Sequence, residues 1–103
     1  MNTIYKNITT TGLATTLIAK SKRATGGISK ITISNNSADA ATVIVDLFDG
    51  GSTVYYICKN IVIPGGAVLV LDDNLTYDGS KYNLRIYNTG AGSGTEDLTI
   101  IIK

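Results

Sequence analysis

Apolar residues recur at every second position in several short stretches of this chain, which is the pattern of a strand with one buried face. In Ile28–Asn35 isoleucines alternate with Lys, Thr and Ser, and Leu98–Lys103 carries three apolar residues at alternate positions. Tyr82–Tyr87 alternates in the same way. The apolar faces consist of Ile31 and Ile33, of Tyr82, Leu84 and Ile86, and of Leu98, Ile100 and Ile102.

Short apolar segments of this kind follow one another at intervals of about ten residues, and no segment has sustained helical spacing with caps at both ends. Thr42–Phe48 is apolar on both faces, so we expect a central strand that is covered on both sides. The pattern predicts an all-β fold, a single antiparallel β-sandwich (jelly-roll or Ig-like) of about eight short strands. The other expected strands are Thr15–Lys20, Thr53–Ile57, Asn60–Ile63 and Ala67–Leu71.

Turn residues separate these strands. Asp49-Gly50-Gly51 is a strong hairpin signal and should fold Thr53–Ile57 back antiparallel onto Thr42–Phe48. Pro64-Gly65-Gly66 can close a turn, because Pro fixes φ and Gly tolerates positive φ. Asn and Asp side chains in 35–39 bond to nearby backbone groups and favour a further turn.

The first twelve residues are polar and rich in Thr and Asn. They fit either an extended N-terminal arm or a short first strand around Thr3–Tyr5. We divide the chain into an arm at 1–12 and a β-sandwich domain at 13–103. An arm loses conformational entropy when it becomes ordered, so we expect it to need a partner on which to dock.

The 103 residues suit one domain with a modest core, and 44% are hydrophobic. No apolar run approaches the roughly 18 residues that span a bilayer, and the first residues lack the features of a signal peptide. The net charge is +1. We therefore expect neither a membrane nor a nucleic acid as a partner.

The charges are nevertheless placed unevenly, because the first 30 residues carry five basic side chains and all eight acids follow them. The basic run Lys20-Ser21-Lys22-Arg23 is either a contact for phosphate or for an acidic neighbouring subunit, or a solvated loop between strands. The candidate partner-contact residues are Tyr5, Lys6, Lys20, Lys22 and Arg23.

Candidate chemistry is sparse in this sequence. There is no His, which removes Ser-His-Asp and Cys-His catalysis, and the single cysteine, Cys58, lies in an apolar strand as a small hydrophobe. Oxygen-bearing side chains at Asp72, Asn74, Thr76 and Asp78 resemble a calcium loop, but the glycine comes two residues later than in an EF-hand and no Glu closes the loop. We expect no enzyme and no cofactor.

Five of the six tyrosines offer one alternative, a stacking platform for sugars or bases: they are Tyr55, Tyr56, Tyr77, Tyr82 and Tyr87. Tyr55 and Tyr56 fall on opposite faces of their strand, so most of the tyrosines are better explained as core residues or cross-strand pairs. A carbohydrate-binding module would instead require an exposed aromatic cluster.

Four motifs resemble those of small virion proteins of tailed bacteriophages. They are Gly-Ile-x-Lys-Ile-x-Ile-x-Asn at Gly27–Asn35, Thr-Val-x-Val-x-Leu-x-Asp at Thr42–Asp49, Ile-Pro-Gly-Gly at Ile63–Gly66, and a closing apolar strand at Leu98–Ile102. The resemblance implies a non-enzymatic capsid decoration (cement) protein that stabilises the assembled phage head. The alternative within the virion is a neck or tail adaptor, or a fibre-attachment protein.

The resemblance also implies partners and a location. We expect contact with the major capsid protein or other virion proteins, a homo-oligomeric state, synthesis in the host cytoplasm and a final place in the phage particle. A decoration protein stabilises a shell because it binds the assembled lattice and not the dissociated subunits. The resemblance implies no catalytic residue.

Overall fold

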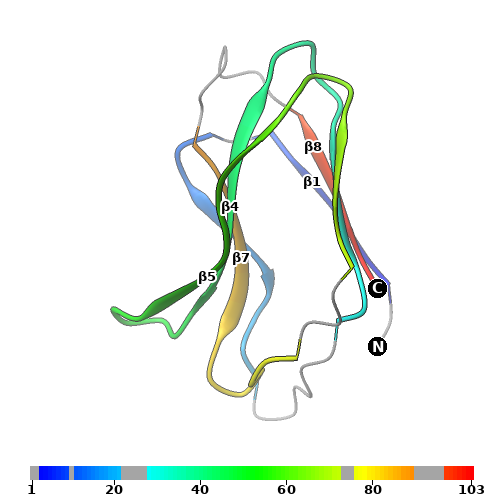
Figure 1. The fold of residues 1–103 in the computed structure, drawn as a ribbon. Helices are drawn as coiled ribbons and strands as arrows, with labels where there is room; N and C mark the ends of the chain where they lie inside the picture. The colour runs from blue at the N-terminus through cyan, green and yellow to red at the C-terminus, as the bar shows by residue number, and fades with distance from the viewer. Residues whose placement is uncertain (1–2, 10, 22–27, 73–75, 90–96) are drawn as a thin grey trace.

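The protein is an all-β sandwich. The structure, a computed structural model, describes residues 3–9, 11–21, 28–72, 76–89 and 97–103. Eight strands form two four-stranded antiparallel sheets that pack face to face (Figure 1). No helix that could span a membrane occurs in these ranges. The strands are β1 (Ile4–Ile8), β2 (Ala14–Ile18), β3 (Ile31–Asn35), β4 (Ala41–Phe48), β5 (Val54–Ile63), β6 (Val68–Leu71), β7 (Asn83–Asn88) and β8 (Leu98–Ile102).

The order of the strands in the two sheets defines the topology. One sheet has the order β1-β8-β3-β6 and the other has the order β2-β7-β4-β5. The chain therefore pairs like one long hairpin, because β4 lies beside β5, β3 beside β6, β2 beside β7 and β1 beside β8. A hairpin wrapped into two sheets in this way is an eight-stranded jelly roll, one of the two sandwich types expected from the sequence.

The first segment of the chain is part of the sandwich over residues 4–8. Strand β1 pairs antiparallel with β8, where Ile8 lies opposite Leu98 and is 4% exposed. Residues 4–8 of the segment 1–12, for which the sequence predicts an arm, are thus an edge strand. This strand overlaps the short first strand around Thr3–Tyr5 that the sequence offers as the alternative. The physical reason is that β1 satisfies backbone N–H and C=O groups that β8 would otherwise leave unpaired at this edge.

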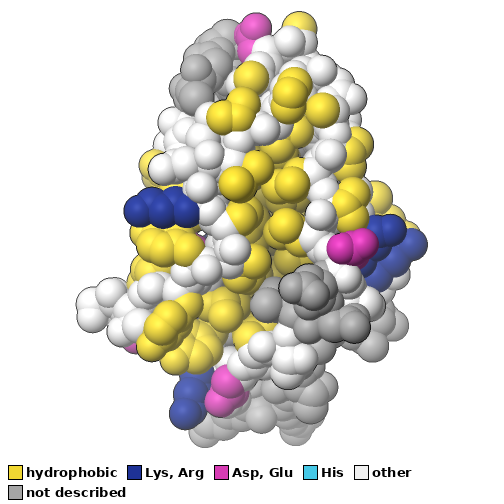
Figure 2. Space-filling view, viewed as in Figure 1, with side chains coloured by type: hydrophobic (Ala, Val, Ile, Leu, Met, Phe, Trp, Pro, Cys, Tyr) yellow, Lys and Arg dark blue, Asp and Glu magenta, His cyan; other side chains and the backbone are white. Residues whose placement is uncertain are grey.

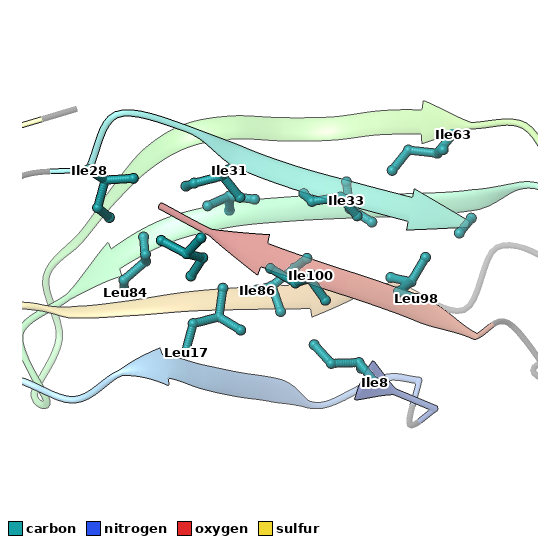
Figure 3. Packing of buried hydrophobic residues seen from close by; sticks show 14 residues of the cluster. Ile8, Leu17, Ile28, Ile31, Ile33, Ile63, Leu84, Ile86, Leu98 and Ile100 are labelled. Atoms are coloured by element: carbon teal, nitrogen blue, oxygen red, sulfur yellow. The ribbon is translucent and has the colours of Figure 1, made fainter. Parts of the chain in front are cut away.

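The core lies between the two sheets, and Figure 3 shows side chains of both sheets pointing toward one another. The apolar faces predicted from the alternation are confirmed for their isoleucines and leucines in β3, β7 and β8, whose side chains are at most 1% exposed. Each such Ile or Leu contributes about 1.5–3 kcal/mol to the free energy of unfolding through burial. Tyr82, which the pattern places on the same face, precedes β7 and is only half-buried. The core residues are Ile8, Leu17, Ile28, Ile31, Ile33, Ala41, Val43, Val45, Ile63, Leu84, Ile86, Leu98, Ile100 and Ile102.

Strand β4 departs from the prediction that both of its faces are covered. It is an inner strand between β7 and β5, and Val43 and Val45 on its inner face are fully buried. On its outer face Ile44 and Phe48 are only half-buried. Neighbouring side chains cover them in part, and no described residues form a third layer over this face. The exception on that face is Asp46, which is 5% exposed.

The β4–β5 hairpin forms at Asp49-Gly50-Gly51, as predicted. Gly50 has a φ of 92°, which favours glycine. The sequence predicts two strands after this turn, Thr53–Ile57 and Asn60–Ile63, where the structure has the single strand β5. Asn60 adopts a φ of 56° within a shift of the β4–β5 register, so the polar residues there form a bulge and not a break.

Candidate interaction surfaces

Tyr5 and Lys6, two of the predicted contact residues, lie on β1 at one edge of its sheet. Tyr5 is 72% exposed and lies opposite Ile101 of β8. Ile101 lies opposite Thr32 of β3, and Thr32 lies opposite Val70 of β6. Tyr5, Ile101, Thr32 and Val70 thus form one line across the outer face of the sheet, which we call the outer row.

A polar network runs beside the outer row. The Thr99 hydroxyl donates to Asn7 Oδ1 at 2.9 Å and accepts from Asn36 Nδ2 at 2.7 Å. The Ser34 hydroxyl donates to Asn36 Oδ1 at 3.0 Å. These bonds link β1, β8 and the end of β3 side by side, so the outer face combines an apolar row with fixed amide and hydroxyl groups.

Lys20 lies in the other sheet, just after the end of β2. Its backbone N–H donates to Asn83 Oδ1 at 2.7 Å, and its ammonium group donates to the Asp49 carbonyl at 2.6 Å. Lys20 is therefore bound to the turn of the β4–β5 hairpin, on a different sheet from the two contact residues of β1. Lys22 and Arg23, the remaining predicted contacts, lie outside the described residues.

The β4–β5 hairpin also carries an aromatic pair that the sequence does not reveal. Tyr55 lies opposite Leu47 on the inner face of β5, and Tyr56 lies opposite Asp46 on the outer face. The Tyr55 and Tyr82 rings meet edge to face, with centroids 5.6 Å apart and planes at 86°. Tyr55 is 55% exposed, and the hairpin that carries it bends away from the opposite sheet (Figure 1). We call Tyr55 and Tyr82 the tyrosine corner.

Asp49 lies beside this corner and is fixed by its own turn. Its Oδ1 accepts hydrogen bonds from the backbone N–H groups of Gly51 at 2.7 Å and Thr53 at 3.2 Å. The hydrogen bond from Gly51 lowers the pKa of the Asp49 carboxyl, and the Lys20 charge lowers it further. The Thr53 side chain also hydrogen-bonds to this carboxylate and contributes to the lowered pKa.

Asp78 lies on the other side of the corner. Its carboxylate accepts hydrogen bonds from the hydroxyl and the backbone N–H of Ser80, which lower its pKa, and it lies 3.9 Å from the Lys81 ammonium. The Tyr82 backbone N–H donates to the Asp78 carbonyl at 3.1 Å. Desolvation raises the pKa of the Tyr82 hydroxyl, as do the nearby Tyr55 and the charges of Asp49 and Asp78.

The oxygen-rich segment 72–78 forms no recognisable cation site in the part that the structure describes. Asn74, one of the four residues considered for calcium, lies outside the described residues, and Asp78 is engaged by Ser80 and Lys81. No group of three or more His, Cys, Asp or Glu side chains in the described ranges could hold a metal ion. Cys58 packs half-buried against the core, and this burial raises the pKa of its thiol.

The neighbouring edges of the two sheets, β5 and β6, expose further apolar side chains. In Figure 2 a band of hydrophobic side chains runs down the middle of the view, between the two sheets seen in Figure 1. Edge strands usually carry charges or Pro that discourage pairing, whereas here they are mainly apolar. The exposed large apolar residues of these strands are Tyr55, Tyr56, Ile61, Val62, Val68 and Val70.

Comparison with known proteins supports the architecture. No family model matches this chain, and no curated protein matches it by sequence. Among solved structures, the chain is similar in fold to a chain of the cyanophage Pam1 capsid asymmetric unit. The match has a TM-score of 0.54 at 16% sequence identity, and it covers 98% of this chain and 81% of that chain. The whole sandwich thus has a counterpart in a phage capsid structure.

Proposed function

We propose that this protein is a structural component of a phage particle and that it binds the assembled head as a decoration protein. The observation that supports this most strongly is the match to a chain of a cyanophage capsid asymmetric unit over 98% of the sequence. A fold alone does not determine a function. The motifs in Gly27–Asn35 and Ile63–Gly66 point to the same class of protein by an independent route.

The outer row is the surface through which we propose that the protein docks on the major capsid protein. Tyr5 and Val70 at its two ends are 72% and 44% exposed, and a rigid sheet holds both of them. Tyr is among the residues that supply much of the binding free energy at protein interfaces, since it buries a large area at a small entropic cost. Lys6, the next residue of β1, adds an exposed charge at this edge of the sheet, although its register partner is the buried Ile100 and not a member of the outer row.

Lys20, Lys22 and Arg23 form the second part of the proposed contact, on a neighbouring copy or on an acidic patch of the capsid protein. We propose that copies of this protein associate with one another on the lattice. Weak contacts suffice there, because several copies in a symmetric cluster bind with a high effective concentration. Binding only to the assembled lattice then shifts the equilibrium toward the intact shell.

Purification from the native source tests the proposal directly. We expect the protein, made in the host cytoplasm, to co-migrate with particles and to be present in hundreds of copies for each particle by quantitative mass spectrometry. A copy number of about a dozen or fewer would indicate that the protein is located in the neck or tail and not on the head. Absence from purified particles would contradict a virion role altogether.

The docking surface needs point variants, because removal of 1–12 would also remove β1 and the buried Ile8. We expect Tyr5→Ala combined with Lys6→Glu to abolish binding to capsids while the fold persists. The matched control is Tyr56→Ala combined with Lys59→Glu, an exposed Tyr and Lys pair on the other sheet. Equal occupancy of the two double variants in a co-sedimentation assay would contradict docking through the outer row.

A further inference from the structure

The tyrosine corner combines exposed aromatic surface with fixed polar groups. Tyr55 lies in β5, and Tyr82 directly precedes β7 of the same sheet. Tyr55 lies on the inner face of β5, the face that is buried elsewhere in the sheet, but more than half of its side chain is exposed. The corner is therefore apolar surface that the core leaves unused.

The charges around the corner balance one another. Lys20 donates to the turn that contains Asp49, and Lys81 lies 3.9 Å from Asp78. An anionic ligand would meet two carboxylates there, and a cationic ligand would meet two ammonium groups. The balance favours a ligand without net charge that can both donate and accept hydrogen bonds.

We propose that the tyrosine corner is a binding site for a saccharide. A sugar ring has an apolar C–H face that can lie on Tyr55, and hydroxyl groups that can donate to a carboxylate oxygen and accept from an ammonium group. Asp49 is a suitable acceptor for this, since the Gly51 and Thr53 bonds hold its carboxylate in a fixed position beside Tyr82. The proposal does not depend on the virion role.

The site is also held in place before a ligand arrives. The β4–β5 hairpin closes with the Asp49 N–H donating to the Thr53 carbonyl at 3.2 Å, and Lys20 fastens the end of β2 to the same turn. Preorganised groups lose little conformational entropy on binding, which increases affinity. The sheet itself, and not a free loop, positions Tyr55.

A printed array of bacterial surface oligosaccharides, probed with the full-length protein, tests the proposal. We expect saturable binding to at least one glycan on the array. A titration with that glycan, monitored by the fluorescence of the tyrosines, then measures the affinity, because this protein has no Trp to dominate the signal. Tyr55→Ala should weaken that binding by about tenfold or more, because one aromatic contact is lost. Tyr82→Ala should weaken it in the same direction.

Tyr56→Ala is the matched control, because Tyr56 is the next residue, is 53% exposed and lies on the opposite face of β5. We expect it to retain full affinity. A second variant, Tyr55→Leu, keeps an apolar side chain at the corner without the aromatic ring, and should lose binding with the fold unchanged by circular dichroism. An array without any bound glycan, or equal losses in Tyr55→Ala and Tyr56→Ala, would overturn the proposal.

Discussion

Arg85 of β7 and Asp46 of β4 form a two-point ion pair across the outer face of their sheet. Arg85 Nε lies 2.9 Å from Asp46 Oδ1, and Nη2 lies 3.0 Å from Oδ2. The Arg85 guanidinium also stacks on the Phe48 ring, at 4.0 Å from its centroid. A planar guanidinium is suited to both contacts at once, so this pair shields a nearly buried carboxylate on a face that no third layer of described residues covers.

Removal of both partners should therefore cost less than the sum of the two single removals. Arg85→Ala leaves the Asp46 carboxylate desolvated without its partner, and we expect a loss of about 2–3 kcal/mol in the free energy of unfolding. Asp46→Ala combined with Arg85→Ala should lose less than the sum of the two single variants. A double-mutant cycle by urea denaturation measures this coupling, and additive losses would contradict it.

Asn35 is a second buried polar residue with a structural role. Its Nδ2 donates to the carbonyls of Asp39 at 2.8 Å and Ile63 at 2.9 Å, while its Oδ1 accepts from the Ser37 hydroxyl at 2.6 Å. The side chain thus joins the turn after β3 to the end of β5. Asn35→Asp has nearly the same shape but no Nδ2 donor, so both carbonyls lose their bond and a charge is buried.

We expect Asn35→Asp to lower the free energy of unfolding by about 2–4 kcal/mol at neutral pH. Thermal denaturation followed by circular dichroism measures the loss. Asn36→Asp is the control, because it also removes an Nδ2 hydrogen bond, to Thr99, but at an exposed position, so it should change stability by about 1 kcal/mol or less. Equal effects of the two variants would show that Asn35 does not join the turns.

Gly65 marks the closest approach of these two turns. A Cβ atom at Gly65 would lie 2.3 Å from the Ala38 carbonyl oxygen, which is backbone and cannot turn away. We expect Gly65→Ala to destabilise the protein by about 2 kcal/mol or more, because the turns must separate. Gly51→Ala, whose Cβ would lie 3.5 Å from Asp49 Oδ1, should be nearly neutral, and chemical denaturation of both variants makes the comparison.

Local patterns explain which parts of the fold are predictable from the sequence. Alternation identifies the buried faces of β3, β7 and β8, and Asp49-Gly50-Gly51 identifies the hairpin, because both signals lie within a few residues. The choice of a jelly roll over an Ig-like sandwich depends on β1 pairing with β8. Asn7 and Thr99, which bond across this pair, are 92 residues apart in the sequence, and a single sequence does not record such a pairing.

The same limit applies to the candidate sites. Tyr5 is exposed in a polar segment and is identifiable by its type and position, but its place in an apolar row follows only from the register with β8 and β3. Tyr55 and Tyr82 are visible in the sequence only as two separate aromatic residues. Likewise, the pattern of Thr42–Phe48 does not show that Arg85, which is 39 residues from Asp46 in the sequence, pairs with its carboxylate in the fold.

Cys58 provides a test that depends on pH. Burial raises the pKa of its thiol above the ordinary value, because the thiolate loses hydration in a half-buried site. We expect alkylation by iodoacetamide to be several times slower than for a free cysteine at pH 8, and to approach the free rate in concentrated urea. Rapid modification of the folded protein at neutral pH would contradict a protected thiol.

The same shift links stability to pH. The pKa is raised in the folded state, so the contribution to stability is fully present below the ordinary thiol pKa of about 8.5 and is lost as pH rises through the folded value. The difference in unfolding free energy between the wild type and Cys58→Ser should therefore be constant between about pH 7 and pH 8. Above that range the wild type should lose stability relative to Cys58→Ser, because only the wild type releases a proton more readily when it unfolds. Urea denaturation of both proteins across this range measures the difference, which would stay flat if the thiol titrated normally in the folded state.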